Sequence, residues 1–328
     1  MCTRIFYKTA AGTYITGRSM DWSDETANTA LWIFPKGMKR NGGVGAKSIE
    51  WVSKYGSVIV SFYALATSDG MNESGLVGNL LYLAEAGYLS PSNMAKPTIS
   101  VGAWLQYMLD NYGSVAEAVQ AMRTDPFRII SADAPNGRPA SVHLCLSDST
   151  GDSAIFEYIE GALQIHHGSE FTVMTNSPVY DQQLALNTYW ELIGGKNMLP
   201  GTISAADRFV RASYYLKSSP KFQERKKSVA AVFSQIRSIG VPLGMSDPDK
   251  PNISSTLWRT VSDHQAKRYY FDSVVDPAVF WVDLDSVDLS PGAKIMKLEI
   301  VGSGLLEGDV SKKFTPCEPF AFLAPAVV

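Results

Sequence analysis

Cysteine stands at position 2 of the chain, directly after Met1. Methionine aminopeptidase removes Met1 when the next side chain is small, and cysteine meets that condition. The product would carry a thiol and a free α-amine on one residue, and an α-amine with a pKa of about 7.7–8.0 is partly neutral near pH 7. Such an amine can accept the thiol proton and later return it to a leaving amine. Cys2 is therefore a candidate N-terminal nucleophile, although position alone favours a small buried strand residue. A lipoprotein cysteine is a third interpretation, which needs a preceding leader.

Two charged residues follow Cys2 at the spacing of a hairpin. If residues 2–7 and 13–18 pair as antiparallel strands, Arg18 and Asp21 return close to Cys2. A guanidinium beside a thiol favours the thiolate, and a carboxylate can orient an α-amine by accepting its N–H. The same spacing also fits a plain surface ion pair between Arg18 and Asp21.

Asn176 is the candidate donor to an oxyanion. Amide hydrolysis passes through a tetrahedral intermediate, whose negative oxygen is stabilised by preorganised donors, by about 3–4 kcal/mol for each donor. An asparagine that ends a buried strand before Ser177-Pro178 can supply such an N–H. A plain turn asparagine is the alternative.

No pattern elsewhere in the chain predicts a metal or cofactor site. His166 and His167 are adjacent, so on a strand they point to opposite faces and cannot easily share one ion. The three cysteines, Cys2, Cys145 and Cys317, are an odd number without a CxxC pair, which argues against a zinc site and against a disulfide framework. No glycine-rich nucleotide loop or GxSxG motif stands out. We therefore expect no metal and no cofactor.

The bulk composition argues against several classes of partner. The 328 residues carry a net charge of −3, and the longest basic run is 225–227, so nucleic acid is not an expected partner. No apolar stretch reaches about 18 residues, so no membrane span is expected. Without a linker or repeat, we expect one domain over 1–328. Residues 1–10 contain no signal core. The compartment stays open: cytoplasmic if Met1 is the native start, periplasmic if a leader was removed.

Strand and helix signals alternate in blocks along the chain. Expected strands cover 5–7, 13–16, 30–34, 49–52, 58–62, 142–146, 154–159, 163–165, 171–175, 257–261, 268–271, 280–284 and 294–300. Expected helices cover 101–112, the segment after a capping box of Ser114 and Glu117, 181–192, 205–216 and 229–236. In 142–146, apolar residues alternate with His143 and Cys145, which predicts a half-buried strand. These blocks indicate an α+β fold with helices layered over antiparallel sheets.

Several segments together resemble the choloylglycine hydrolase family, which includes penicillin V acylases and bile salt hydrolases. They are residues 1–4 (MCTR), 18–22 (RSMDW), 69–76 (DGMNESGL), 174–178 (MTNSP), and 199–201 (LPG) with 207–211 (DRFVR). No single segment is specific, but they occur in family order over at least the first two thirds of the chain. The resemblance implies a four-layer αββα fold, in which two stacked antiparallel sheets lie between helix pairs, and a homotetramer.

The resemblance also implies a role for each matched residue near the N-terminus. Cys2 would be the nucleophile and its amine the base. Arg18 would lie beside the thiol, and Asp21 would hold the amine. Asn176 would supply an oxyanion-hole N–H.

Three further positions carry alternatives or a departure from the family pattern. Arg208 matches the arginine that completes the site, and Arg211, three residues further along the helix, is the competing choice. Many bile salt hydrolases have asparagine ten residues after Asn72, where this chain has Tyr82. The contribution of Tyr82 to the oxyanion hole would therefore come from its backbone N–H. Trp22 and Tyr82 would line the acyl pocket, with simple core packing as the alternative.

Residues 20–22 and 79–85 resemble the Gram-negative penicillin V acylase branch, although that branch often has tryptophan at the position of Tyr82. We therefore expect an amide hydrolase that cleaves the side-chain acyl amide of penicillin V, whose flat phenoxyacetyl group stacks on aromatic rings, or related N-acyl amides, acyl-homoserine lactones among them. A conjugated bile salt hydrolase, with a wide apolar cleft for a sterol, is the alternative. A non-catalytic binding protein on the same fold and a cysteine-based redox protein are alternatives from other classes.

Overall fold

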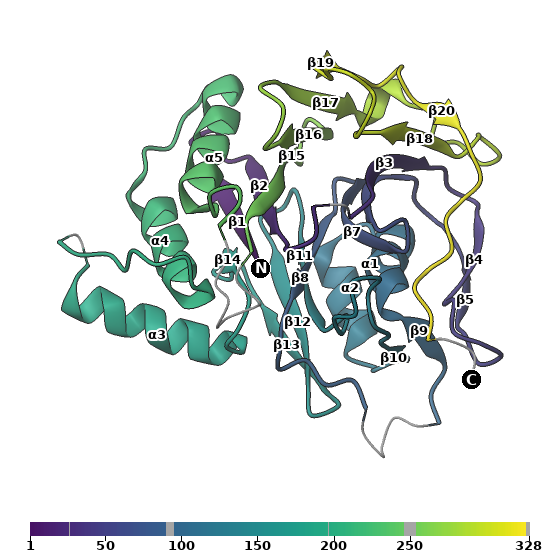
Figure 1. The fold of residues 1–328 in the computed structure, drawn as a ribbon, viewed down its shortest axis with the longest axis horizontal. Helices are drawn as coiled ribbons and strands as arrows, with labels where there is room; N and C mark the ends of the chain where they lie inside the picture. Colours follow the sequence, from purple (N-terminus) through teal and green to yellow (C-terminus); the bar gives the residue numbers. More distant parts are fainter. Residues whose placement is uncertain (26, 90–94, 196, 246–253, 326–328) are drawn as a thin grey trace.

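Two large sheets organise the chain (Figure 1). The computed structural model describes residues 1–328 except 26, 90–94, 196, 246–253 and 326–328. The first sheet runs β14 (Val173–Met174), β1 (Cys2–Lys8), β2 (Tyr14–Asp21), β15 (Thr256–Asp263), β16 (Arg268–Ser273), β17 (Val279–Asp283) and β19 (Gly308–Asp309). Adjacent strands in this sheet are antiparallel except β17 and β19, which are parallel.

The second sheet is antiparallel throughout its described pairs. It runs β13 (Ala162–His167), β12 (Ser153–Ile159), β11 (Val142–Ser147), β8 (Val77–Tyr82), β7 (Ala66–Asn72), β6 (Ser57–Phe62), β3 (Thr29–Phe34), β18 (Met296–Glu299) and β20 (Thr315–Pro316). Two short pairs lie outside it: β4 (Lys39–Asn41) with β5 (Glu50–Val52), and β9 (Thr98–Ser100) with β10 (Arg128–Ile130).

Helices cover the outer faces of both sheets. Helices α1 (Val101–Asn111) and α2 (Val115–Met122) pack on the second sheet, while α4 (Ala205–Ser218) and α5 (Arg225–Ile239) pack on the first (Figure 1). Helix α3 (Tyr180–Ile193) lies against α4. This is the α+β, four-layer arrangement predicted from the family resemblance. Within the described part of the chain, no helix is long and apolar enough to cross a membrane.

Strands β7 and β8 were not among the predicted strands, although they lie at the centre of the second sheet. Polar residues and paired glycines break their apolar pattern: Gly70 lies opposite Gly78 in the strand register. The glycines are needed because α1 packs directly on them. A Cβ added at Gly78 would lie 2.3 Å from Leu105 Cδ1, which is closer than any real contact.

The prediction of a half-buried β11 is wrong. His143, Leu144, Cys145 and Leu146 are all buried. The second sheet has α1 and α2 on one face and the first sheet on the other, so both sets of alternating side chains are covered. His143 and Cys145 therefore lie in the interior and need partners there.

A buried histidine ties the end of β15 to the β7–β8 turn. His264 Nδ1 lies 2.7 Å from the Gly75 carbonyl and must donate to it, and Nε2 lies 2.8 Å from Thr16 Oγ1. Burial lowers the pKa of His264 from 6.5 to about 4, so the ring is neutral near pH 7 and Nε2 accepts from Thr16.

This histidine predicts a pH-dependent loss of stability. The unfolded chain binds the His264 proton near pH 6.5 and the folded chain only near pH 4. The contribution of His264 is therefore complete above pH 6.5 and falls as the pH drops to 4, by about 3 kcal/mol in total. Urea unfolding at pH 7.5 and pH 4.5 should show a smaller pH effect for His264→Gln than for the wild type. An equal pH effect in both proteins would contradict the assignment.

Candidate active site

Cys2 lies at the start of β1, directly opposite Met20 on β2. Its Sγ lies 3.7 Å from Met20 Sδ and 3.5 Å from Arg18 Nη2. The predicted hairpin is confirmed, and its register explains the contact with Arg18. Side chains two residues apart on a strand share a face, so Arg18 and Met20 both flank the Cys2 thiol in the space between the sheets.

Arg18 is held behind the thiol by groups from three other strands. Its guanidinium lies 3.8 Å from the Asp69 carboxylate, 3.2 Å from the Leu80 carbonyl and 4.4 Å from the centre of the Trp258 ring. Burial raises the pKa of the Asp69 carboxyl, although Arg18 and hydrogen bonds act in the opposite direction. One such bond comes from Asn79 Nδ2 at 2.7 Å. These supporting residues were not predicted to belong to the site, although Asp69 lies in a segment that matches the family.

Asp21 and Arg208 lie on the opposite face of the first sheet. Asp21 is one residue from Met20, so its side chain points toward α4 instead of toward the thiol. Arg208 on α4 lies 3.6 Å from Asp21 Oδ2 and donates to the Cys2 carbonyl at 2.6 Å. Thr256 Oγ1 donates to Asp21 Oδ1 at 2.6 Å. All these side chains are buried.

Arg211 does not reach this group of residues. Its Nη1 donates to the carbonyls of Pro200 at 2.9 Å and Thr202 at 2.7 Å, in the loop before α4. Of the two arginines proposed from the sequence, only Arg208 contacts Cys2. Arg211 instead supports the loop that leads into the helix.

Met1 extends the hairpin by one residue. Its amine donates to the Asp21 carbonyl, and its carbonyl accepts from the Asp21 N–H at 2.7 Å. Burial lowers the pKa of the Met1 amine. With Met1 present, the Cys2 nitrogen is a backbone amide that faces away from β2. It donates to Asn176 Oδ1 at 2.6 Å. Removal of Met1 would leave the Cys2 amine beside Asn176.

The orientation of the Asn176 side chain is set by its neighbours. Oδ1 accepts from the Cys2 N–H and from Arg208 Nη2, the latter at 2.8 Å, so it must be the oxygen. Nδ2 then donates to the Tyr82 carbonyl at 2.6 Å. An amide nitrogen carries two hydrogens, so one remains for another acceptor.

The backbone N–H and C=O of Tyr82 lie on the edge of β8 that faces Asn176. Tyr82 pairs with Val142, but the N–H and C=O of Val142 are both bonded to the Tyr88 hydroxyl, at 2.7 and 2.9 Å. The N–H and C=O of Tyr82 therefore point away from β11 and toward Asn176, because both groups of one residue share an edge in an antiparallel strand.

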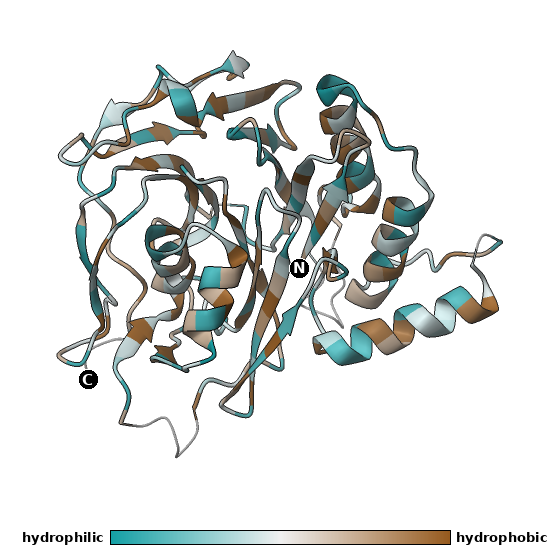
Figure 2. Ribbon diagram, turned by 180° about the vertical axis from the view of Figure 1, so that it is seen from behind, coloured by the Kyte–Doolittle hydropathy of each residue, from teal (hydrophilic) through white to brown (hydrophobic). Residues whose placement is uncertain are grey.

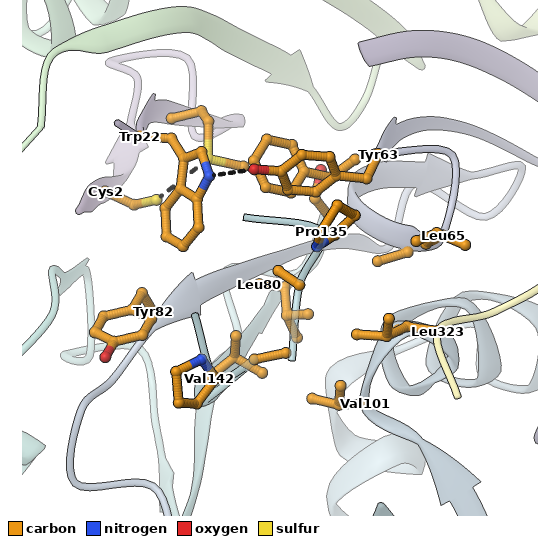
Figure 3. A pocket seen from close by; sticks show the side chains of 18 residues that line it. Cys2, Trp22, Tyr63, Leu65, Leu80, Tyr82, Val101, Pro135, Val142 and Leu323 are labelled. Atoms are coloured by element: carbon orange, nitrogen blue, oxygen red, sulfur yellow. Dashed lines mark hydrogen bonds between the residues drawn. The ribbon is translucent and has the colours of Figure 1, made fainter. Parts of the chain in front are cut away.

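An apolar cavity begins at the Cys2 thiol, and Trp22 and Tyr82 are among the residues that line it (Figure 3). It encloses about 700 Å³ between its lining atoms, part of it open to solvent. Trp22 Nε1 donates to Tyr63 Oη at 2.8 Å, which fixes the indole plane at the Cys2 end. Val101 and Leu323 lie at the other end, where α1 begins and the C-terminal segment crosses.

The family described as linear amide C–N hydrolases, choloylglycine hydrolase family, matches residues 2–299 of this chain. The chain belongs to this family. It is therefore a linear amide hydrolase, as the resemblance in the sequence predicted. His167 lies 2.8 Å from Asp152, and His166 lies 3.7 Å from Asp181 and 3.9 Å from Glu157.

Among family members, the similarity is stronger to penicillin V acylases than to bile salt hydrolases. A penicillin V acylase from Pectobacterium atrosepticum is 48% identical over 94% of this chain and 88% of its own. The structure of penicillin V acylase from Agrobacterium tumefaciens is 47% identical with a TM-score of 0.91, covering 98% of this chain and 100% of its own. A bile salt hydrolase/transferase from Bifidobacterium longum subsp. longum is 23% identical over 85% of this chain and 94% of its own.

Proposed function

We propose that this hydrolase cleaves the side-chain amide of penicillin V, or of related N-acyl amides, through an acyl-enzyme on Cys2. The main support is that the Cys2 thiol lies 3.5 Å from a buried guanidinium and at the start of an apolar cavity edged by aromatic rings. The cavity suits an acyl group, and the guanidinium of Arg18 places a positive charge beside the sulfur.

The catalytic base is the Cys2 amine that appears when Met1 leaves. Within the described residues, Asp21 Oδ2 accepts no hydrogen bond although it is buried, and it lies 3.6 Å from Arg208. The freed amine would have Asn176 Oδ1 on one side and Asp21 on the other as acceptors. These two residues orient the amine so that its lone pair can take the thiol proton, directly or through water.

The thiolate then attacks the carbonyl carbon of the substrate amide. The carbonyl oxygen becomes an oxyanion, for which the second Nδ2 hydrogen of Asn176 and the N–H of Tyr82 are the proposed donors. Collapse breaks the C–N bond, and the leaving amine takes the proton held by the Cys2 amine. Water attacks the resulting thioester by the same route, which releases the acid and restores the thiol.

Side-by-side turnover of penicillin V, glycocholate and decanoyl-homoserine lactone tests the substrate class. We expect the highest kcat/KM for penicillin V, because Trp22 and Tyr82 offer ring faces to its phenoxy group. Glycocholate as clearly the best substrate would contradict the proposal and favour a bile salt hydrolase. Binding of penicillin V without turnover of any of the three amides would favour a non-catalytic binding protein.

The far end of the cavity predicts a limit on acyl length. Leu323 is held there by hydrogen bonds from its N–H to Leu65 and from Ser100 to its carbonyl. Leu323→Trp should fill this end and exclude about two methylene groups of a long acyl chain, which costs about 1.6 kcal/mol or roughly 15-fold in kcat/KM. The measurement is kcat/KM for a series of N-acyl amides whose acyl chains have four to twelve carbons. Leu305→Trp, at an exposed leucine outside the cavity, is the matched control. Equal losses for short and long chains would contradict the prediction.

We also propose that the chain assembles as a homotetramer. Helix α3 carries hydrophobic residues along its length although it lies at the edge of the molecule (Figure 2). Leu192 is 82% exposed and Tyr189 is 56% exposed on this helix. Such a surface is typical of a protein–protein contact. Light scattering during gel filtration tests the assembly, and a monomer at micromolar concentration would contradict it.

A further inference from the structure

We propose that His143 and Glu157 are positioning residues for the reaction, because they hold the chain on both sides of Asn176. This inference rests on the proposed function, in which Asn176 orients the amine and donates to the oxyanion. His143 lies on β11 and Glu157 on the neighbouring β12, where His143 Nδ1 and Glu157 Oε1 are 2.8 Å apart. Both side chains are buried, and neither has a role in the steps described above.

The first contact lies directly before Asn176. His143 Nε2 is 3.0 Å from the Thr175 carbonyl. A carbonyl oxygen only accepts, so Nε2 carries a hydrogen and donates it. Because Thr175 precedes Asn176 in the chain, this bond fixes the peptide from which the Asn176 side chain extends.

The second contact lies after Asn176, at the start of α3. Glu157 Oε2 accepts from the Tyr180 N–H at 3.0 Å. Val179 is the N-cap of this helix and makes no side-chain cap hydrogen bond, so Glu157 supplies the acceptor that the sequence next to the helix lacks. A carboxylate is also favoured at this end of a helix. The segment between Thr175 and Tyr180 is thus anchored at both ends by one pair of side chains.

The pair shares one proton between Nδ1 and Oε1. Burial alone would raise the pKa of the Glu157 carboxyl, but the hydrogen bonds from His143 and Tyr180 outweigh it and lower the pKa. The lowered pKa keeps the Glu157 carboxyl ionised near neutral pH. Gln183 Nε2 adds a bond to the Asn176 carbonyl at 2.7 Å. The Asn176 backbone is held on several sides, as expected for a group that must be placed to within a fraction of an ångström.

A first experiment compares His143→Leu with His264→Leu, which removes a second buried histidine that lies away from Asn176. We expect kcat for penicillin V to fall about 10- to 100-fold in His143→Leu, as for a misplaced catalytic group, with KM changed less than threefold. His264→Leu should lose stability but keep kcat within threefold. Equal kcat values for the two variants would overturn the proposal.

A double-mutant cycle with Asn176→Ala tests whether His143 acts through Asn176. If it does, His143→Leu should lower kcat no further in a chain that already lacks the Asn176 side chain. Additive losses in the double variant would overturn the proposal. Failure of the proposed function would give a different result, because Asn176→Ala by itself would then keep full activity.

Glu157→Gln supplies a conservative variant that should fold even if the leucine variants do not. A glutamine can donate to His143 Nδ1 and accept from the Tyr180 N–H, so every hydrogen bond of the pair is retained without the charge. We expect kcat within fivefold of wild type for Glu157→Gln and a loss of at least tenfold for Glu157→Leu. A loss in Glu157→Gln as large as that in Glu157→Leu would overturn positioning by these hydrogen bonds.

Discussion

Replacing Cys2 by alanine is expected to lower the hydrolysis of penicillin V by at least about 10⁴-fold, to the background rate, because the proposed acyl-enzyme forms on the Cys2 thiol. Alanine retains most of the small volume at this buried strand position, so the fold should persist. Turnover, circular dichroism and thermal unfolding measure the two effects. Unchanged turnover in Cys2→Ala would defeat the mechanism.

Cys145 supplies the matched control for this experiment. It is also a buried cysteine, but burial raises the pKa of its thiol to about 11, so it stays protonated at neutral pH. Its Sγ lies 3.5 Å from Asn79 Oδ1, away from the cavity. Cys145→Ala should therefore keep its activity within about threefold and lose at most modest stability.

The mechanism also requires the loss of Met1. The Met1 amine is bonded to the Asp21 carbonyl, one residue too far along the chain to serve the Cys2 thiol in the proposed manner. The intact mass of an active sample should therefore lack one methionine. Full activity in a sample that retains Met1 would contradict the assignment of the Cys2 amine as the base.

Replacing Arg208 by methionine is expected to reduce kcat by at least about 100-fold and to destabilise the fold. Arg208 donates to the Cys2 carbonyl and to Asn176 Oδ1 and lies beside the Asp21 carboxylate. Its loss would leave a buried carboxylate without its cation, which costs about 3–5 kcal/mol, and would release the orientation of the Asn176 amide. Steady-state kinetics and urea unfolding at pH 7.5 measure both effects.

Arg211→Met is the comparison that separates the two arginines of the helix. Arg211 donates hydrogen bonds to the loop carbonyls of Pro200 and Thr202. We expect Arg211→Met to keep kcat within about threefold. If Arg211→Met lost as much activity as Arg208→Met, the side chain that completes the site would have to be reassigned.

The local part of the site was predictable from the sequence because it depends on one hairpin. Once β1 and β2 pair with Cys2 opposite Met20, the two-residue period of a strand determines the rest. Arg18 falls beside the thiol and Asp21 falls on the opposite face. Spacing alone predicted that both residues return to Cys2, but not that they lie on different sides of the sheet.

The supporting residues were not predictable in the same way. Asp69 lies on β7, which the strand pattern missed because glycines and polar residues interrupt it. His143 was assigned to an exposed face, since its alternation with apolar residues is typical of a half-buried strand. Only the stacking of two sheets under two helix layers turns that face into an interior, where an imidazole must be paired.

The sequence by itself determined that Cys2 can become a nucleophile with its own base, because that chemistry needs a small second residue and the removal of Met1. The order of the matching segments then pointed to Asn176 and Arg208, and the family match confirms the family of the chain. The tertiary structure alone placed Arg208, and not Arg211, against Cys2. It also oriented the Asn176 amide and joined His143 to Glu157. These contacts join residues that lie between 14 and 206 positions apart in the chain, on different strands and helices, and no local period in a sequence encodes such pairings.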